Sequence, residues 1–497
     1  MRRGTDGDSL SGWLAFAAPL ALYIATLSPG VDFWDIGEMQ TVPYLLGIAH
    51  PTGFPLAILL GWAFTHALPF GDPAWRMSLL CAIAVAIAAR ALHAIVVTLT
   101  DDARLGVASA LAFAVGGIVW THAVRADVHD LALAAIALAL ASALEAGAKR
   151  DPRLLMRSAL ALGAALAIHP IAALALPCAI VFAWPAIVAA RPRARARAVA
   201  GGLAPLALYL YVPLRSAYVE THGGDPGRDL GLVGTAIFDN GAPSTPSTFW
   251  RYISGADFSP LHAFARAAST DGAGRTLRFA HDVAYGNEGY VMLAFALIGF
   301  CALVVRRPRV ASGFASLALG SAAFVANYAA ESDTARYALP ALWAIGACAA
   351  VGVSWLVRAL TSDAPRIAPH ASSLAVAALA LALLPGIAGV AHDVGETTRT
   401  DDARELGREV ARRTADGSLV IATWNFATPL AYEIYVAHSL GTRRIACGWP
   451  HDFAGLYPGW QARFPHIYFV LARAYDVTPF ANSLYISKKW RLSELRS

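Results

Sequence analysis

Charged residues are scarce in this chain. Only 15% of its 497 residues are Asp, Glu, Lys or Arg, whereas soluble proteins carry about 25%. Hydrophobic residues make up 57% of the sequence. This composition excludes an ordinary soluble domain and predicts a polytopic α-helical membrane protein.

Cysteine is also rare, with five residues in the whole sequence. Cys81, Cys178, Cys301 and Cys348 lie in apolar segments, and Cys447 lies outside them. No pair has the spacing of a metal site or of a disulfide framework, which argues against structural zinc and structural disulfides. The net charge of +5 is small, and the arginines gather in short loops, which favours membrane orientation over nucleic-acid binding.

Long hydrophobic runs make up much of the sequence. A membrane span needs about 20 apolar residues. The N-terminal run has a basic start without a cleavage site after it, so we expect a retained first helix. Candidate spans lie at 11–28, 76–99, 105–123, 130–147, 157–171, 172–190, 199–213, 290–305, 310–330, 337–358 and 371–391.

The basic loops orient these spans, because Lys and Arg collect on the cytoplasmic side. If the short apolar stretch 55–69 does not cross, "AKRDPRLLMR", "RPRARARA" and "RRPR" share the side of the N-terminal "MRR". We therefore expect 55–69 to be an interfacial or re-entrant helix. The same rule splits 157–190 into two spans near His169-Pro170. The prediction is about eleven spans, with the N-terminus inside and the C-terminus outside.

The outward segments then carry most of the polar residues. We expect a transmembrane module at 1–397, with a first outer loop at 29–75 and a long outer loop at 214–289. Residues 398–497 are expected to form a small extracytoplasmic (periplasmic) α/β domain. Its helices are predicted in "DDARELGREVARRTADG" and "ATPLAYEIYVAHSL", and its strands in "SLVIATW", "RRIACG" and "HIYFVLA".

The first outer loop contains a pair of acids. Asp35 and Glu38 are three residues apart, so they share one face of a helix. One interpretation is helix capping; the other is a general base or metal ligand at the membrane boundary. Trp34 would keep water away and anchor the loop at the interface. His50, in the turn "HPTGFP", is either a turn residue or a member of the same site.

Arginines follow the ends of three spans, at positions 125, 215 and 336. Arg125 could form a local pair with Asp127, or it could bind a phosphate. Arg215 follows Tyr211 in "LYLYVPLRSAY", and Arg336 lies in "ESDTARYALP". If Arg125, Arg215 and Arg336 converge at the outer face, they suit an anionic lipid head group.

His169 stands in an apolar run. It is either a core histidine bonded to a backbone carbonyl or a part of the pocket.

The motifs also resemble a known family. "FWDIGEMQTVPYLLGIAHPTGFPL", "GDPAWRMSLLCAI", "HAVRADVHDLAL", "LYLYVPLRSA" and "LVIATWNFATPLAYEIY" are similar to motifs of bacterial multispanning proteins, formerly a domain of unknown function. These proteins are related to the eukaryotic endoplasmic-reticulum protein O-mannosyltransferase, among the GT-C glycosyltransferases. The resemblance implies a GT-C-like fold, a lipid-linked sugar donor, a catalytic acid in the first outer loop and inversion at the sugar.

Several residues of this sequence match functional positions in the motifs of the family. Asp35 and Glu38 match the two acids of the first loop, His50 matches the His-Pro histidine, and Arg215 matches the arginine of P-[LI]-R-[SA]. The sequence departs from the family at four places: His122 replaces Gln, Asp127 replaces Glu, His129 replaces Tyr, and Ile168 replaces an Asn. These departures bear on which donor and which acceptor are bound more than on the class of reaction.

The sequence thus predicts an inner-membrane glycosyltransferase whose active site faces the periplasm. It would move a sugar, mannose by the resemblance, from a polyprenyl-phosphate donor to a hydroxyl of a protein, glycan or lipid. Asp35 would be the general base; His50 and the three arginines would bind the donor phosphate. A divalent metal is possible but nothing in the spacing requires one. The alternatives are a lipid or solute transporter or flippase, which predicts symmetric halves, and a non-catalytic scaffold.

Overall fold

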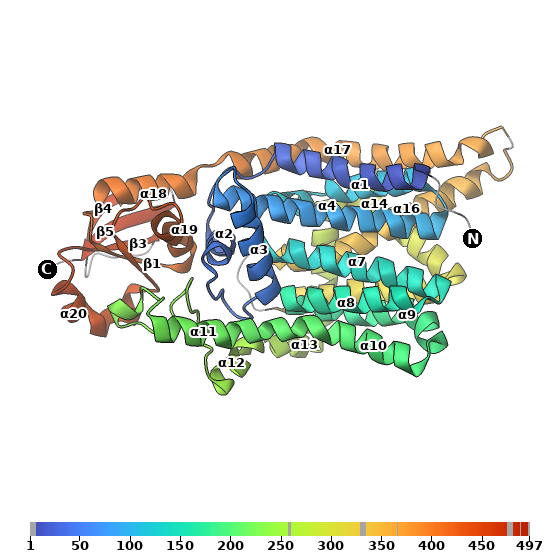
Figure 1. Ribbon diagram of the computed structural model, residues 1–497. Helices are drawn as coiled ribbons and strands as arrows, with labels where there is room; N and C mark the ends of the chain where they lie inside the picture. The colour runs from blue at the N-terminus through green and yellow to red at the C-terminus, as the bar shows by residue number, and fades with distance from the viewer. Residues whose placement is uncertain are drawn as a thin grey trace. The chain divides into compact units, whose positions relative to one another are not determined.

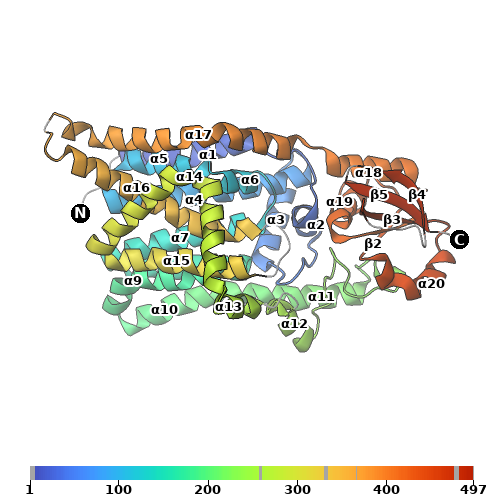
Figure 2. The same ribbon diagram turned by 180° about the vertical axis from the view of Figure 1, so that it is seen from behind.

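The structure is a computed structural model that describes residues 6–256, 260–328, 334–364, 366–474, 481–487 and 489–495. It contains two compact units, each built from separated stretches of the chain (Figures 1 and 2). Unit 1 comprises Met1–Leu27, Cys81–Leu208 and Phe258–Thr398, and unit 2 comprises Ser28–Leu80, Tyr209–Asp257 and Arg399–Ser497. Unit 2 therefore joins most of the predicted outer segments to the predicted C-terminal domain.

The regular elements of unit 1 within its described residues are all helices, as the apolar runs predict. Neighbouring antiparallel helices, such as α7, α8 and α9, pack side by side (Figure 1). The helices are α1 (Asp6–Ala25), α4 (Pro73–Thr100, whose start belongs to unit 2), α5 (Ala103–Ala114), α6 (Gly117–Ala123), α7 (Val128–Lys149), α8 (Pro152–Ile168), α9 (Leu176–Ala189), α10 (Pro192–Leu203), α13 (Pro260–Ala267), α14 (Gly272–Arg306), α15 (Pro308–Asn327), α16 (Leu339–Thr361) and α17 (Ala371–Arg399). Short 3-10 segments are η1 (Pro170–Ala175), η2 (Ala204–Leu210), η5 (Thr334–Ala338) and η6 (Ala368–His370).

Seven helices within the described residues are long and apolar enough to cross a membrane, and two bent pairs raise this number to nine. Each of the eleven predicted spans falls on a helix, but α1 and α8 are below the length of a full apolar span. The predicted polytopic helical class is confirmed. The count of eleven and the orientation stay predictions.

The predicted break at His169-Pro170 is confirmed. Helix α8 ends at Ile168, and η1 begins at Pro170, which has no backbone N–H to continue the helix. His169 Nδ1 accepts a hydrogen bond from the Ile171 backbone N–H at 3.0 Å. At Nδ1, His169 thus bonds to a backbone amide, and not to a backbone carbonyl as the core-histidine interpretation expects.

Unit 2 combines helices from three stretches with a five-stranded sheet. The helices are α2 (Trp34–Leu45), α3 (Pro55–Ala67), α11 (Tyr211–His222), α12 (Pro246–Ile253), α18 (Asp402–Arg413), α19 (Trp424–Tyr435) and α20 (Tyr457–Gln461), with 3-10 segments η3 (Arg228–Leu230) and η7 (Pro450–Leu456). Helix α3 corresponds to the short apolar stretch 55–69. The segment 214–289, expected as one long loop, contains helical turns in α11, α12, α13 and the first half of α14.

The sheet has the order β2-β1-β3-β5-β4, with strands β1 (Leu419–Ala422), β2 (Arg444–Cys447), β3 (Ile467–Ala472), β4 (Ala481–Ile486) and β5 (Trp490–Leu495). Strand β1 pairs in parallel with β2 and β3, whereas β5 is antiparallel to β3 and β4. The helices and strands predicted up to β3 are confirmed, and β4 and β5 were not predicted.

Alternating residues of β1 face opposite sides of the sheet. Val420 and Ala422 pack in a core with residues of α18 and α19. Leu419 and Ile421 pack in a second core with Phe453 of η7 and with α20. Because both faces are covered, every residue of β1 is buried, as is usual for a central parallel strand.

Candidate active site

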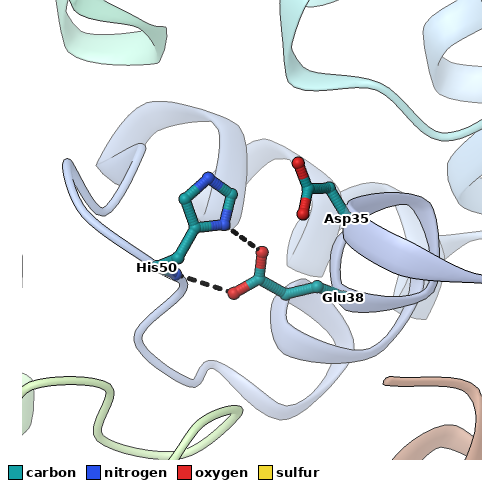
Figure 3. A group of neighbouring side chains, drawn as sticks. All are labelled: Asp35, Glu38 and His50. Carbon is teal, nitrogen blue, oxygen red and sulfur yellow. Dashed lines mark hydrogen bonds and ion pairs between the residues drawn. The ribbon is translucent and has the colours of Figure 1, made fainter. Parts of the chain in front are cut away.

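The side chains of Asp35, Glu38 and His50 lie close together in the first stretch of unit 2, Ser28–Leu80 (Figure 3). Asp35 and Glu38 lie on the first turns of α2, and His50 lies in the loop before α3. One Glu38 oxygen, Oε1, accepts a hydrogen bond from the His50 backbone N–H at 2.7 Å, and Oε2 bonds to Nδ1 of the imidazole. Glu38 is fully buried, so this pairing satisfies both oxygens of a carboxylate that water does not reach.

Helix capping does not explain Asp35. Helix α2 begins after Phe33, which makes no side-chain capping bond, and Asp32 accepts a hydrogen bond from the Phe33 backbone N–H. Instead, Asp35 Oδ1 accepts a hydrogen bond from the indole Nε1–H of Trp424 at 2.9 Å. Asp35 is therefore not the N-cap residue, but it is the acid in the first turn of α2, where a negative charge is favourable.

Trp424 is the tryptophan beside the carboxylates, and the sequence analysis did not select it. Its ring also meets the His50 ring edge-on, with 6.1 Å between centroids. Trp34 was expected to keep water from the site, but its side chain is 52% exposed and its carbonyl accepts from Thr428. Trp424, and not Trp34, is therefore the tryptophan whose ring contacts Asp35 and His50, and the roles expected for Trp34 stay predictions.

The far end of α2 is held by Arg215 and Tyr211, both from α11. Arg215 Nε donates to the carbonyl of Leu46 at 2.7 Å, and the Tyr211 hydroxyl donates to the carbonyls of Leu46 and Gly47. Leu46 is the C-cap of α2, where the carbonyls are negatively polarised and favour a cation. Arg215 and Tyr211 thus fix the helix that carries Asp35 and Glu38.

The His-Pro turn is packed against Tyr252 of α12. The Tyr252 hydroxyl donates to the carbonyl of Ala49, next to His50. Gly53 has φ +89°, and a Cβ at this position would lie 2.8 Å from the Tyr252 ring. The turn therefore needs glycine both for its backbone conformation and for the close approach of the ring.

Glu38 and Asp35 differ in burial and in electrostatic surroundings. Burial raises the pKa of Glu38, and the neighbouring Asp35 carboxylate adds to the rise, while the contacts with His50 oppose it. Asp35 is partly exposed and contacts the polar indole N–H of Trp424. Of the two carboxylates, Asp35 is therefore the one that solvent reaches, whereas both oxygens of Glu38 bond to His50.

The same three side chains have the composition of a divalent-metal site. One potential ligand atom from each of Asp35, Glu38 and His50 lies within 4.8 Å of the other two. Two carboxylates and an imidazole suit a divalent cation. However, both oxygens of Glu38 are already bonded to His50, so metal binding would require Glu38 to exchange this pairing.

Unit 1 carries a second polar cluster, centred on Asp127 at the N-terminus of α7. Asp127 Oδ1 caps the helix by accepting from the His129 backbone N–H at 2.8 Å. Its oxygens also contact Nδ1 of His129 at 2.7 Å and Nδ1 of His122 at 3.1 Å. Arg336 approaches Asp127 to 4.0 Å, and His169 stacks near His129 with 4.4 Å between ring centroids.

The local pair of Arg125 with Asp127 stays a prediction. Arg125 Nε donates to the carbonyl of Thr121, one turn before it, and the guanidinium of Arg336 lies 4.0 Å from Asp127. The structure therefore brings together Asp127, His169 and Arg336 in unit 1. It separately brings together Asp35, Glu38 and His50 in unit 2. The convergence of Arg125, Arg215 and Arg336 stays a prediction, because these residues belong to different units.

Comparison with known proteins matches residues 35–187 to the family model described as the Protein O-mannosyl-transferase TMEM260 N-terminal domain. This range includes Asp35, Glu38, His50 and His169, and it ends before Arg215. A protein from Mus musculus named Protein O-mannosyl-transferase TMEM260 is 34% identical over 116 residues, which are 23% of this chain and 16% of the mouse protein. The match thus spans less than a fifth of that relative.

Solved structures show the same fold. ArnT from Cupriavidus metallidurans in the apo state aligns with a TM-score of 0.59 at 12% identity, over 98% of both chains. ArnT bound to undecaprenyl phosphate aligns with a TM-score of 0.52, also at 12% identity and over 98% of both chains. The fold class expected from the motifs, that of GT-C glycosyltransferases, is therefore confirmed.

Proposed function

Because the chain is related to the GT-C-type family of O-mannosyl-transferases, we propose that it is a membrane glycosyltransferase. The donor is a polyprenyl-phosphate sugar, and the acceptor is a hydroxyl group. Mannose is the proposed sugar, because the relative is named for its transfer. A polyprenyl-phosphate donor is supported by the similar fold of ArnT, which has been solved with undecaprenyl phosphate.

The observation that carries this proposal is the unequal environment of the two acids on α2. Glu38 is buried and occupied on both oxygens by His50, whereas Asp35 is partly exposed beside Trp424. A general base must be reachable by the proton that it removes. Asp35 therefore takes the role of the base. Glu38 and His50, bonded to each other, hold the structure of the site around it.

The proposed reaction is a single displacement. The acceptor oxygen attacks the anomeric carbon while Asp35 takes its proton, and the bond between that carbon and the phosphate oxygen breaks. The polyprenyl phosphate leaves with the bonding electron pair, and because the acceptor attacks the face of the carbon opposite the phosphate, the sugar configuration is inverted. A positioned base of this kind contributes about 10²–10⁴-fold to the rate.

The leaving phosphate gains negative charge as the bond breaks, so cations placed in advance stabilise the transition state more than the ground state. Arg336 is proposed for this role because it lies in a polar cluster of unit 1 with three histidines. Arg125, Arg215 and His50 are proposed to assist. Arg215 also has a positioning task through its bond to the end of α2.

The proposed site faces the periplasm from the inner membrane, because the basic loops all fall on the opposite side of the predicted topology.

The test is donor cleavage by the purified full-length protein. Synthetic polyprenyl-phosphate mannose, labelled in the sugar, is incubated with the protein in nanodiscs, and labelled products are separated from the intact lipid. We expect the bond between sugar and phosphate to be cleaved, with the label released to water or moved to an added hydroxyl acceptor. A donor that stays intact, or that only crosses a vesicle membrane unchanged, contradicts the proposal and favours a transporter.

A further inference from the structure

Unit 2 contains a second group of acidic residues, at the end of α11 and in the loop 223–245 between α11 and α12. Glu220 and Asp225 both act electrostatically on Asp239, and Arg228 is the guanidinium that acts on the same carboxylate. Arg228 lies 3.5 Å from Glu220, measured between Nη2 and Oε1. One guanidinium does not compensate three carboxylates, so these four residues carry an excess of two negative charges when all are ionised.

Two of these carboxylates are almost completely buried. Asp225 is 1% exposed and Asp239 is 0% exposed. Asp225 Oδ1 accepts hydrogen bonds from the Gly227 backbone N–H and from the Thr235 hydroxyl. Within the part of the chain that the structure describes, Asp225 Oδ2 and both oxygens of Asp239 have no hydrogen-bond partner. Buried carboxylates are normally hydrogen-bonded, paired or bound to a metal, so these three oxygens indicate a ligand.

A neutral oxygen points independently to the same ligand. Ser216, on α11, is 0% exposed, and its hydroxyl acts on the Asp239 carboxylate. Among the described residues, however, Ser216 Oγ has no hydrogen-bond partner. The hydroxyl and the carboxylate thus lie near each other without a hydrogen bond between them, which leaves both available to one cation.

The backbone of the loop fixes the two buried carboxylates. The Gly241 N–H donates to the Gly234 carbonyl at 3.1 Å, and the Asp239 N–H donates to the Thr235 carbonyl at 3.2 Å. Gly234 and Gly241 have φ of +68° and +75°, a conformation that glycine adopts without strain. Thr235 also holds Asp225 through its hydroxyl. Both carboxylates are therefore positioned by one closed loop before any ligand arrives.

The ligand atoms identify the class of cation. The three carboxylate oxygens and the hydroxyl of Ser216 are hard oxygen donors, and the group contains neither imidazole nor thiolate. Zinc and other transition metals favour nitrogen and sulfur ligands. Ca²⁺ takes about six to eight oxygens in flexible geometry, whereas Mg²⁺ demands a near-ideal octahedron and keeps much of its water. An irregular loop of oxygen donors is therefore better suited to Ca²⁺.

We propose that Ser216, Asp225 and Asp239 bind a calcium ion. The direct ligands are Asp225 Oδ2, the two oxygens of Asp239 and Ser216 Oγ, and backbone carbonyls or water complete the coordination. The ion compensates the excess negative charge of the group and offsets the cost of burying two carboxylates. This inference assigns a cation site and does not depend on the proposed transfer reaction.

The proposed ion would stabilise the segment that leads to His50. Phe238, next to Asp239, accepts a hydrogen bond at its carbonyl from the Ile48 backbone N–H at 3.2 Å. Arg215, next to Ser216, donates to the Leu46 carbonyl. Neighbours of two calcium ligands thus hold residues 46–48, directly before the turn of His50. Calcium would therefore act on the candidate site through the backbone, without contact to a substrate.

Hydrogen exchange of the full-length protein in nanodiscs tests the site locally. Exchange is followed by mass spectrometry in 10 mM Ca²⁺, in 10 mM Mg²⁺ and in a chelator, and the helix α18 serves as the internal reference. Extracellular calcium sites have Kd values of about 10⁻⁴–10⁻³ M, so 10 mM Ca²⁺ lowers the population of the open, ion-free loop about 10–100-fold. We expect exchange in 223–245 to slow by at least about tenfold in Ca²⁺, with less than half of this factor in Mg²⁺.

Matched variants locate the ion. Asp225→Asn and Asp239→Asn each remove the charge of one ligand, and we expect exchange in Ca²⁺ to stay within about twofold of exchange in chelator. Asp416→Asn changes an acid of the same unit that bonds to Thr442 and should keep the full calcium effect. Asp35→Asn removes a carboxylate of the other group with the composition of a metal site and should keep it as well.

Four outcomes would overturn the proposal: no calcium effect in the wild-type protein, an equal effect of Mg²⁺, an effect that persists in both Asp225→Asn and Asp239→Asn, or an effect lost in Asp35→Asn alone. Loss in the two loop variants, with retention in Asp416→Asn and Asp35→Asn, supports it. Because no readout uses sugar transfer, wild-type protein that shows the calcium effect but leaves polyprenyl-phosphate mannose intact contradicts the proposed function and leaves the calcium site standing.

Discussion

Glu38 and His50 behave as one unit at the scale of single residues. A buried carboxylate is tolerated only when it is hydrogen-bonded, and Glu38 has both of its oxygens on His50. This arrangement fixes the imidazole and the turn that carries it. In the proposed mechanism, Glu38 therefore acts indirectly, through the position and charge of His50.

Glu38→Gln tests this positioning role. The variant keeps an oxygen for the His50 backbone N–H but loses the charged contact to the imidazole. Because a hydrogen bond to a charged group contributes about 1.5–3 kcal/mol, we expect kcat for sugar transfer to fall about 10–100-fold. Glu433→Gln changes another buried glutamate of unit 2, bonded to Ser439, and should keep kcat within about twofold. Equal losses in the two variants would show a general effect on folding.

Asp239 predicts a pH dependence of stability. Burial raises the pKa of Asp239 to about 6, with Glu220 and Asp225 adding to the rise and Ser216 and Arg228 opposing it. The unfolded value is about 3.9, so the folded state binds more protons between these values and loses stability as pH rises from about 4 to 6. The loss then persists above pH 6.

Asp239→Asn removes this titration. The variant should be more stable than wild type at pH 8 by about 1–2 kcal/mol, after allowance for solvent screening, and the difference should disappear below pH 4. Thermal unfolding of the purified protein across this pH range is the measurement. A variant whose stability difference is the same at pH 4 and pH 8 would exclude this titration as the cause.

At the scale of elements, the contact that matters most for the candidate site is the one between helices α2 and α19. Trp424 and Thr428, one turn apart on α19, bond to Asp35 and to the carbonyl of Trp34 on α2. The C-terminal α/β segment therefore supplies part of the surroundings of Asp35, and we propose that its helix α19 also positions Asp35 for catalysis.

Trp424→Phe keeps an aromatic ring and removes the N–H that bonds to Asp35. We expect kcat/KM for sugar transfer to fall about tenfold, since a hydrogen bond to a carboxylate is lost. Trp449→Phe, an exposed tryptophan of the same unit, is the control and should remain near wild type. If both variants transfer sugar at the wild-type rate, the contact between α19 and α2 has no catalytic importance.

The elements that were predictable from sequence are those with a strong local signal. The break after Ile168 follows from Pro170, and β1, β2 and β3 follow from short apolar runs between helices. Strands β4 and β5 were missed because β5 mixes charged and apolar residues and pairs with strands from other positions. The helices inside 214–289 were missed because glycine, serine and proline there suggest only turns.

In the candidate site, too, only residues that lie close together in the sequence could be predicted. Asp35, Glu38 and His50 were predictable because they lie close together in the sequence and in recognisable motifs. Trp424 was not, because its contact with Asp35 joins positions 389 residues apart. The approach of Arg336 to Asp127 was likewise not predictable, because Arg336 comes from a distant segment of the sequence.

At the scale of the whole molecule, orientation decides where the reaction takes place. The positive-inside rule predicts that the C-terminal α/β segment lies outside the cytoplasm and that the basic loops lie inside. Alkaline phosphatase fused at the C-terminus should therefore be active in intact bacterial cells, because this enzyme folds only outside the cytoplasm. A fusion after Arg307, in the basic loop between α14 and α15, should be inactive. The opposite pattern would place the site on the cytoplasmic side.

The transfer rate of Asp35→Asn tests the role of this carboxylate most directly. The variant keeps the shape of the side chain and an oxygen for the Trp424 N–H, but it cannot accept the proton of the acceptor hydroxyl. With protein level and thermal stability matched to wild type, we predict a loss of about 10²–10⁴-fold in transfer from polyprenyl-phosphate mannose. Transfer within about twofold of wild type would contradict the assignment of Asp35 as the base.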